Sequence, residues 1–256
     1  MSITDFSIWG ILFVCAGVFC ASFIDAIAGG GGIISLPVYI ISGLPAHMAI
    51  GTNKMSSTIG TSVSTLRYIK NGYADLKLAL PCIMIAIPGG FAGTILQLMV
   101  VEKYLKFVLM ILLPIVAFVI LKQKSFPEER GDINPVLQKA VIFGSTFIIS
   151  IYDGFYGPGT GTFLLLAFCN LGKLDVRTAS GNMKIVNFSS NIGALITSFF
   201  AHKIFLALGA IAAVFSIAGH YLGAGLTIKN GSKIVKPAII IVLSLLLVKV
   251  LLEFIF

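Results

Sequence analysis

Apolar runs long enough to cross a lipid bilayer recur along the chain, and they limit its fold more than any other feature. A spanning helix needs about 20 consecutive apolar residues. Candidates of that length cover 7–28, 46–69, 77–100, 104–121, 136–153, 177–200, 204–227 and 237–255. Two shorter apolar segments, 33–43 and 161–171, follow glycine-rich breaks and are expected to be half-helices, re-entrant segments or short tilted spans. The sequence therefore predicts an all-α, polytopic membrane protein with about eight full transmembrane helices and two short broken segments.

Composition agrees with a membrane location. Hydrophobic residues make up 57% of the chain, charged residues only 11%, and the mean hydropathy is +1.02. A soluble domain has a large exposed shell that must be covered by more polar groups than this. The first basic residue is Lys54, so segment 7–28 lacks the basic leader of a signal peptide and is predicted to be a retained first helix.

The two halves of the chain share a pattern of residues, which indicates an internal repeat. Three pieces of the first half recur in the same order in the second: Asp25-x-x-x-Gly29-Gly30-Gly31 as Asp153-x-x-x-Gly157-Pro158-Gly159, Ala49–Lys54 as Ala179–Lys184, and Gly89-x-x-x-Gly93 as Gly219-x-x-x-Gly223. Repeats of this kind are typical of secondary transporters. The chain thus divides into repeat one at 1–122, a hydrophilic linker at 123–135 and repeat two at 136–256.

The distribution of basic residues predicts that repeat two is inverted relative to repeat one. With the N-terminus outside and the short segments crossing, each repeat has five crossings, an odd number, so the repeats point in opposite directions. Three basic residues then fall in exterior loops (Lys103, Lys106, Lys203) and twelve in interior loops (Arg67, Lys70, Lys77, Lys122, Lys124, Arg130, Lys139, Lys173, Arg177, Lys229, Lys233, Lys236). Re-entrant short segments with parallel repeats would put basic loops on both sides, against the positive-inside bias.

Glycine-rich breaks are the first candidate binding feature. They contain Gly29, Gly30, Gly31 and Gly32 in repeat one, and Gly157, Gly159 and Gly161 in repeat two. Unwound backbone at membrane depth is tolerated only where it is buried or lines a cavity. A helix that restarts after a break directs its N–H groups and positive dipole end at the break, which suits an anion. The alternative is that these glycines only permit tight packing or a kink, but their recurrence in both repeats favours binding.

Two lysines lie inside predicted helices, at matching places in the two repeats. Lys54 and Lys184 are each about eight residues from the start of their helix, roughly 12 Å into the membrane. Ionisable residues at such depth are costly and are usually functional, although a lysine can also extend along its stem to the interface. We expect both lysines to contact the anion. Neighbouring polar side chains, including Thr52, Asn53 and Asn182, can hydrogen-bond an oxyanion or hold helices together.

Asp25 and Asp153 each precede a glycine-rich break. A carboxylate within the membrane can take up a proton, which makes both residues candidates for coupling transport to protons or another ion. Each can instead neutralise a nearby lysine or cap the glycine turn. These alternatives stay open because the sequence does not fix the depth of either residue.

Other kinds of chemistry have no support in the sequence. The two GxxxG motifs predict close helix packing, with His220 and Tyr221 as packing residues. There is no HExxH or GxGD motif, no Ser/His pair at helical spacing, and the histidines are scattered. No catalytic residue, metal site or cofactor is therefore expected. The net charge of +8 reflects topology, so no nucleic-acid partner is expected either.

Several of these motifs together resemble the TauE/SafE family, the sulfite exporter family. They are Asp25-x-x-x-Gly29-Gly30-Gly31-Gly32 followed by Pro37, then Ala49-Ile50-Gly51-Thr52-Asn53-Lys54, then the glycine-rich helix at Pro88–Gly93. The resemblance covers nearly the whole chain, and Gly-Thr-Asn-Lys is its most specific element. It implies a multi-pass inner-membrane permease for sulfite, sulfoacetate or other sulfur-containing organic anions.

The resemblance also implies where substrate binds. It points to Gly29–Gly32, Thr52, Asn53 and Lys54, with Gly157, Gly159, Gly161 and Lys184 as their counterparts. Repeat two departs from the pattern, because Ser180-Gly181-Asn182-Met183 stands where repeat one has Ile50-Gly51-Thr52-Asn53. The two halves are therefore expected to contact substrate unequally.

The sequence as a whole predicts a secondary transporter rather than an enzyme. It is expected to move a small anion, foremost sulfite or an organosulfonate, across the cytoplasmic membrane by alternating access. An anion channel, or a transporter of a non-sulfur carboxylate, is the alternative. The expected partners are the anion and the lipid bilayer. Coupling to a proton or sodium ion, a homodimer, and the direction of transport are left open.

Overall fold

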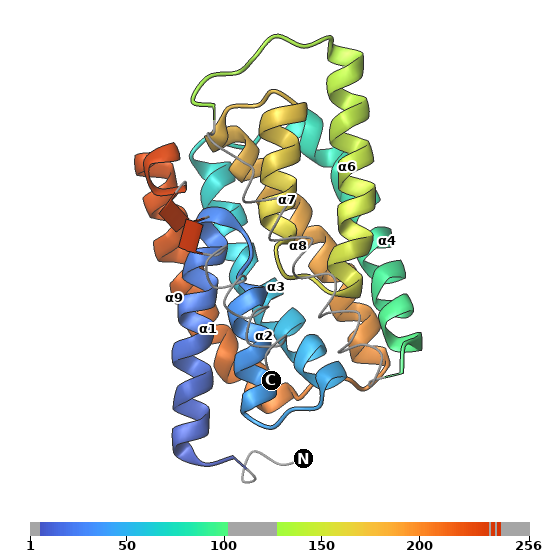
Figure 1. The fold of residues 1–256 in the computed structure, drawn as a ribbon, viewed down its shortest axis with the longest axis vertical. Coiled ribbons are helices and arrows are strands. Elements are labelled where there is room, and N and C mark those ends of the chain that lie inside the picture. The colour runs from blue at the N-terminus through green and yellow to red at the C-terminus, as the bar shows by residue number, and fades with distance from the viewer. Residues whose placement is uncertain (1–5, 102–126, 236, 239, 242–256) are drawn as a thin grey trace, which may run out of the picture.

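The computed structural model describes residues 6–101, 127–235, 237–238 and 240–241, and these residues form a helical bundle (Figure 1). The helices are α1 (Ile8–Ala28), α2 (Gly32–Ile41), α3 (Ala46–Lys70), α4 (Leu76–Met99), α6 (Pro135–Phe155), α7 (Thr160–Leu166) continued by the π-helical turn η2 (Ala167–Leu171), α8 (Val176–Phe200) and α9 (Leu206–Asn230). The predicted all-α fold is confirmed. The predicted segments 104–121 and nearly all of 237–255 lie outside the described residues, so the predicted total stays a prediction.

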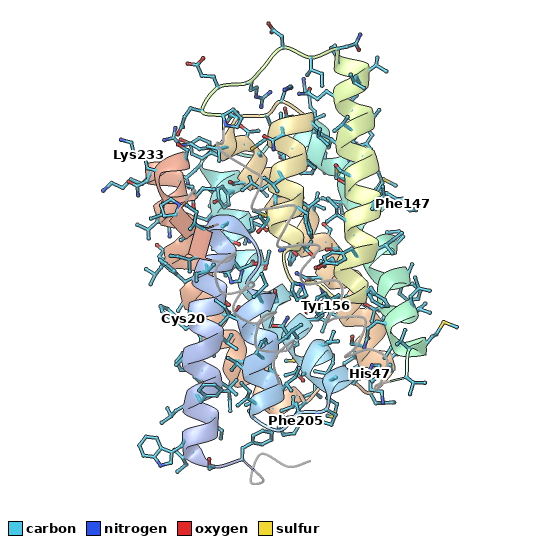
Figure 2. All side chains as sticks on the ribbon, viewed as in Figure 1. Cys20, His47, Phe147, Tyr156, Phe205 and Lys233 are labelled. Atoms are coloured by element: carbon cyan, nitrogen blue, oxygen red, sulfur yellow. The ribbon has the colours of Figure 1, made fainter. Side chains whose placement is uncertain are left out.

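Four helices form an apolar outer layer. Helices α1, α4, α6 and α9 are each long and apolar enough to cross a membrane. Large apolar side chains are exposed on their outer faces, among them Trp9, Met84, Phe147 and Val214. Figure 2 shows Phe147 pointing away from the bundle. Apolar surface of this extent is unstable against water but suits contact with lipid.

Two further long helices, α3 and α8, form a polar centre. They contact each other, and they are packed against members of the outer layer: α3 against α9, and α8 against α4. Their buried side chains include Lys54, Thr61, Lys184, Asn187 and Asn191. Polar groups at membrane depth must be satisfied by other protein groups, which explains why these helices occupy the centre although their hydropathy alone does not mark them as spans.

Small residues set the packing of the outer layer. A Cβ on Gly93 would lie 2.0 Å from the carbonyl oxygen of Ile151 on α6. A Cβ on Gly219 would lie 2.5 Å from the carbonyl oxygen of Phe19 on α1. Backbones approach this closely only where side chains are absent. This confirms the packing role predicted for the two GxxxG motifs.

The two ends of the bundle differ in charge. At the upper end in Figure 1 the linker residues 127–134 arch over the bundle to the start of α6, and Val176 N at the start of α8 donates to Pro127 O. Arg130 lies 3.4 Å from Asp75 and 3.4 Å from Asp175, and Gly131 N donates to Lys173 O. Basic residues gather at this end: Arg67, Lys70, Lys77, Arg130, Lys139, Lys173, Arg177, Lys229 and Lys233. At the opposite end Lys203 is the basic residue of the described loops, and His47 and Phe205 lie there, far from Lys233 in Figure 2.

The Arg130 ion pairs are expected to contribute little to stability. The Arg130 side chain is 51% exposed, and exposed ion pairs typically contribute about 0–1 kcal/mol. The free energy of unfolding of Arg130→Ala, measured by heating in detergent, should therefore differ from that of the unchanged protein by less than about 1 kcal/mol. A much larger loss would mean that the linker holds the ends of α3 and α8 together.

Candidate functional site

The two glycine-rich breaks meet at the centre of the bundle. The chain leaves α1 at Gly29 with φ +70°, and a Cβ there would lie only 2.3 Å from the Cα of Gly161. The hydroxyl of Thr162 donates to the carbonyl oxygens of Ala28 and Gly29, at 3.0 and 2.9 Å. The last carbonyl oxygens of a helix have no partner within that helix. Thr162 therefore supplies a hydrogen-bond donor to carbonyl oxygens at the end of α1 that would otherwise be unpaired at membrane depth.

Asp25, at the end of α1, forms a charged cluster with Lys184 and His220. The carboxylate of Asp25 accepts hydrogen bonds at the centre of this cluster. Its Oδ1 accepts from Gly30 N and Gly31 N, each at 3.0 Å. Its Oδ2 lies 2.6 Å from Lys184 Nζ and 3.2 Å from His220 Nε2. The ammonium of Lys184 also donates to the carbonyl oxygen of Asp25. Asp25 therefore caps the glycine turn and neutralises a lysine at once.

Lys54 on α3 belongs to a second charged cluster, formed with Asp153, Ser190 and Asn191. Lys54 Nζ lies 2.9 Å from Asp153 Oδ2 and donates to Asn191 Oδ1 at 2.8 Å. The Ser190 hydroxyl donates to Asp153 Oδ2 at 2.6 Å. The side chains of Lys54 and Asp153 are only 4% and 3% exposed. The ion pair is thus removed from solvent and held by further hydrogen bonds, as buried ion pairs require.

The pairing is crossed between the halves of the chain. Lys54 of the first half pairs with Asp153 of the second, and Lys184 of the second half pairs with Asp25 of the first. Each lysine charge is therefore balanced in this conformation. An anion that reaches either ammonium must compete with a carboxylate for it.

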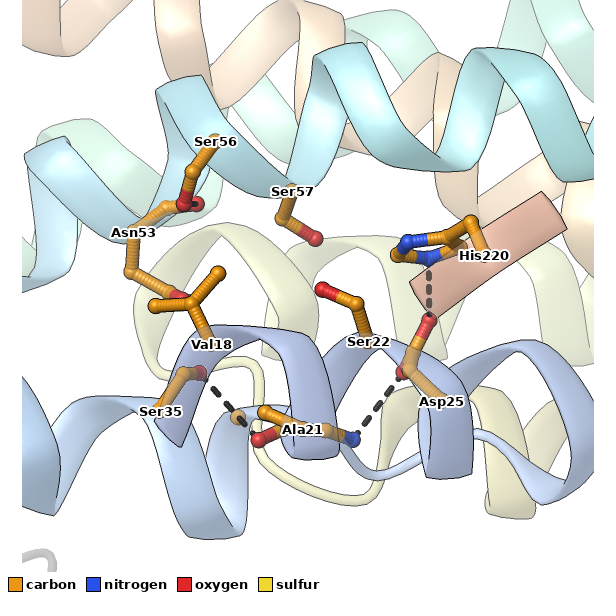
Figure 3. A pocket seen from close by; sticks show the side chains of 11 residues that line it. Val18, Ala21, Ser22, Asp25, Ser35, Asn53, Ser56, Ser57 and His220 are labelled. Atoms are coloured by element: carbon orange, nitrogen blue, oxygen red, sulfur yellow. Dashed lines mark hydrogen bonds and ion pairs between the residues drawn. The ribbon is translucent and has the colours of Figure 1, made fainter. Parts of the chain in front are cut away.

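Two small polar cavities flank these pairs. The first lies between α1, α2, α3 and α9 and is lined by Asp25, Asn53, Ser56, Ser57 and His220, together with Val18, Ala21, Ser22, Gly31, Gly32 and Ser35. Figure 3 shows Ser22, Ser57 and His220 directed toward this space. The second is lined by Asp25, Gly32, Asn53, Lys54, Ser57, Asp153, Gly157, Thr160, Gly161, Asn187 and Asn191. Each has a volume of about 20 Å³, room for roughly one water molecule, so neither is large enough for an oxyanion in this conformation.

The structure brings most of the predicted site residues to these cavities. Asn53, Lys54, Gly157 and Gly161 line the second cavity, and Gly31 and Gly32 line the first. Gly30 binds Asp25, Gly29 packs against Gly161, and Gly159 (φ +82°) precedes α7. Lys184 is enclosed behind Asp25 and lines neither cavity.

Thr52 and Asn182 lie away from both cavities and make matching backbone contacts. Thr52 Oγ1 accepts from Phe205 N, and Asn182 Oδ1 accepts from Asp75 N, each at 2.9 Å. Both pairs are related by the same shift of 130 residues. Each side chain satisfies the backbone at the start of a helix from the other half, α9 or α4.

Sequence reasoning missed the role of His220. It was predicted to be a packing residue, but its Nε2 faces Asp25 Oδ2. The signal was a histidine inside an apolar span at a position where the repeat partner, 130 residues earlier, is Gly90. Tyr221, also predicted to pack, lies under the guanidinium of Arg67, 4.1 Å from the ring centre. In the part of the chain that the structure describes, no three His, Cys, Asp or Glu side chains form a group that could hold a metal ion.

Comparisons with known proteins identify the family of this chain. The family model for the sulfite exporter TauE/SafE matches residues 14–250. A protein of Sinorhizobium sp named "Probable membrane transporter protein ORF9" is 33% identical over 96% of this chain and 93% of its own length. The protein YfcA of Escherichia coli K12, with the same kind of name, is 31% identical over 94% of this chain and 89% of its own.

A third relative, from Haemophilus influenzae, is also named as a probable membrane transporter protein and is 32% identical over 90% of this chain and 89% of its own length. No solved structure matches the chain. With the family model covering nearly the whole sequence and relatives of this similarity, the chain belongs to the TauE/SafE family and is a multi-pass membrane protein of that transporter family.

Proposed function

We propose that this chain is a secondary transporter that moves a small anion, foremost sulfite or an organosulfonate, across the cytoplasmic membrane by alternating access. The observation that supports this most strongly is the pair of buried lysine–aspartate contacts where the two broken segments cross. Ionisable residues at such depth are expensive and mark substrate or ion pathways. Broken helices that meet near the midplane are typical of substrate sites in transporters.

The same proposal includes two inverted repeats that move against each other. In Figure 1, α1 begins at the lower end and α6 at the upper end, so these counterparts run in opposite directions. The helix packing of the two halves also matches. Helix α9 of the second half packs against α1 and α3 of the first, and α4 of the first half packs against α6 and α8 of the second. The contacts of Thr52 and Asn182 match as well. Basic residues at one end agree with the predicted interior side.

The substrate site is proposed to be the second cavity, around Lys54. In the closed conformation Asp153 holds the lysine, and Asn53, Asn187 and Asn191 supply further polar groups. When the cavity widens, an oxyanion takes the place of Asp153 at Lys54 Nζ and accepts from the neighbouring amide donors. The glycines of both breaks allow the backbone to approach it. Thr52 and Asn182 act at a distance by fixing α9 and α4.

The small size of both cavities favours a carrier over an anion channel. Each cavity holds roughly one water molecule, so substrate cannot pass without a change of conformation. A carrier is also expected to show countertransport, in which unlabelled anion on the far side accelerates uptake. Flux through a channel does not show this.

Transport by reconstituted protein tests the proposal. Liposomes containing the purified chain should take up labelled sulfite or methanesulfonate with saturation, and internal unlabelled anion should accelerate uptake. Because a hydrogen bond to a charged group contributes about 1.5–3 kcal/mol, Lys54→Met/Asp153→Asn should lower kcat/KM roughly tenfold to hundredfold. This double variant removes the ion pair without leaving one charge buried alone.

Lys203→Met is the matched control, since it removes a lysine from an exposed loop. It should transport as the unchanged protein does. Full transport by the Lys54/Asp153 double variant would assign that pair a structural role. Uptake of acetate or lactate in preference to both sulfur anions would favour the carboxylate alternative.

A further inference from the structure

His220 carries a proton on Nδ1, and its hydrogen bonds require it. Nδ1 lies 3.0 Å from the backbone carbonyl oxygen of Ser216, one turn earlier on α9. A carbonyl oxygen can only accept, so Nδ1 must donate. In a neutral imidazole the other nitrogen, Nε2, then has no hydrogen and can only accept.

Nε2 nevertheless faces a second acceptor. It lies 3.2 Å from Asp25 Oδ2 and 3.2 Å from Thr61 Oγ1. The Thr61 hydroxyl can donate to the Nε2 of a neutral imidazole, but that ring would still hold a nitrogen lone pair 3.2 Å from a carboxylate oxygen inside a buried site. One additional proton, carried by Nε2 and donated to Oδ2, removes the conflict. Oδ1 cannot take this role because Gly30 and Gly31 already donate to it.

We propose that His220 and Asp25 form a proton-binding site, present in only one half of the protein, whose occupancy is coupled to binding of the anion. This inference rests on the proposed transport function and adds the coupling ion and its place. Sodium is disfavoured at Asp25, because both oxygens of this carboxylate already accept from N–H donors and Lys184 provides a positive charge 2.6 Å away.

The other half lacks the groups that make this site. Residues 130 positions before Ser216 and His220 are Ala86 and Gly90 on α4. There the space corresponding to the imidazole is closed by backbone, because a Cβ on Gly90 would lie 2.0 Å from the carbonyl oxygen of Ser190. Asp153 is consequently bound by Lys54 and Ser190 alone among the contacts described. The two aspartates are thus chemically unequal although their lysine pairs match.

Charge balance explains why the proton and the anion bind together. The pairs Lys54–Asp153 and Lys184–Asp25 are each neutral, so the additional proton gives the centre a charge of +1. A monoanion beside Lys54 restores neutrality, whereas without the proton it would leave an unbalanced negative charge in a buried site. Asp25, Asn53 and Ser57 each line both cavities, which places the two sites in contact. By linkage, each ligand then strengthens binding of the other.

The groups that face His220 leave few other sources of a pH response. Asp25 faces it from α1 and Thr61 from α3, Ser22 of α1 lines the same cavity and is bonded to Ser216, and Lys184 of α8 binds the same carboxylate oxygen. On α9 itself Ser216 is its neighbour. Of these side chains, His220 is the one whose ordinary titration falls between pH 5 and 8.

The first test measures the proton directly and needs no anion. Protein labelled with ¹⁵N-histidine is compared by NMR with the His220→Gln variant, and the signal that the variant lacks is assigned to His220. In the unchanged protein this signal should report protonation of both ring nitrogens at pH 6. Glutamine keeps a donor toward Asp25 but does not titrate. A ring that stays singly protonated from pH 5.5 to 8 would overturn the proposal, whatever the variant does to folding.

The second test counts protons taken up on anion binding. Methanesulfonate is the probe, because its own charge does not change between pH 5.5 and 8. At pH 7.5 its binding to purified protein in weak buffer should remove up to one proton per anion from solution. Its Kd should rise about tenfold per pH unit once the free site loses its proton. His220→Gln should bind with pH-independent affinity and no proton uptake, while His202→Asn, in an exposed loop, should behave as the unchanged protein.

The outcomes separate the two proposals. Anion binding without proton uptake would overturn the coupling and leave the transport function standing. No binding of methanesulfonate or sulfite to folded protein would overturn the anion site itself, and the coupling with it. Proton uptake that persists in His220→Gln would move the coupling site away from His220.

Discussion

Replacement of Lys184 by methionine is expected to lower the free energy of unfolding by about 3–5 kcal/mol. Methionine matches the length of the lysine stem but leaves the buried carboxylate of Asp25 without its closest cation. The Lys184 side chain is 0% exposed and that of Asp25 only 10%, so water cannot compensate. The substitution also removes the ammonium group that donates to the carbonyl oxygen of Asp25 at the end of α1. Unfolding of purified protein in detergent, followed by heat or denaturant, measures the loss.

A double-mutant cycle separates the ion pair from packing. Asp25→Asn/Lys184→Met removes both charges, and asparagine keeps an oxygen for the Gly30 and Gly31 N–H groups. This variant should recover a substantial part of the stability lost in Lys184→Met, because no charge is left buried alone. Lys203→Met, at an exposed position, should unfold as the unchanged protein does. If the double variant is as unstable as Lys184→Met, packing rather than charge explains the effect.

Replacement of Gly29 by alanine is expected to cost about 2–5 kcal/mol. Part of this arises from the backbone, since φ +70° with ψ +156° is a combination that essentially only glycine adopts, and an L-residue there is strained by at least about 1–2 kcal/mol. The rest arises from overlap, because the new Cβ would lie 2.3 Å from Gly161 Cα and 2.5 Å from Thr162 N. Both neighbours are backbone atoms and cannot rotate away, and overpacking typically adds 1–3 kcal/mol.

Gly72→Ala separates the two contributions. Gly72 has φ +74°, nearly that of Gly29, but a Cβ there meets nothing within 4 Å. Its loss of stability should be confined to about 1–2 kcal/mol of backbone strain. Unfolding of both variants in detergent gives the difference. Equal losses would show that the crossing of the two breaks is loose enough to accept a methyl group.

Much of the fold could be read from the sequence because lipid imposes strict lengths. The described helices begin and end within a few residues of the predicted segments, including both short ones, since each apolar run ends at a glycine, proline or charged loop. The packing glycines could be predicted for a similar reason. Residues four apart lie on one face of a helix, so Gly89 and Gly93 share a face whatever surrounds them.

The candidate site could be predicted only as a set of residues. Repetition in the sequence singled out Lys54, Lys184, Asp25 and Asp153, since a charge inside an apolar span rarely occurs twice without a role. Their partners could not be found, because pairing across 99 or 159 residues depends on how α1, α3, α6 and α8 are placed beside one another. The spacing of residues along the sequence does not give the distance between two helices in the folded protein.

His220 shows where sequence reasoning ended. Its place beside a GxxxG motif favoured packing, and its neighbour in space, Asp25, is 195 residues away. Thr52 and Asn182 show the reverse case. Both belong to a polar stretch beside a lysine, yet their side chains face helix starts and not the cavities.

A membrane location, the recurrence of one residue pattern in both halves of the chain, and the charged residues inside apolar segments can all be read from the sequence alone. These properties depend on local apolar length and on residue identity, which lipid converts directly into structure. The packing of the helices shows that each lysine is balanced by the aspartate of the other half and that, among the described residues, Asp25 and not Asp153 has a histidine beside it. The physical reason is that a buried charge is stabilised by groups within about 3 Å, and only the packing of distant helices brings such groups together.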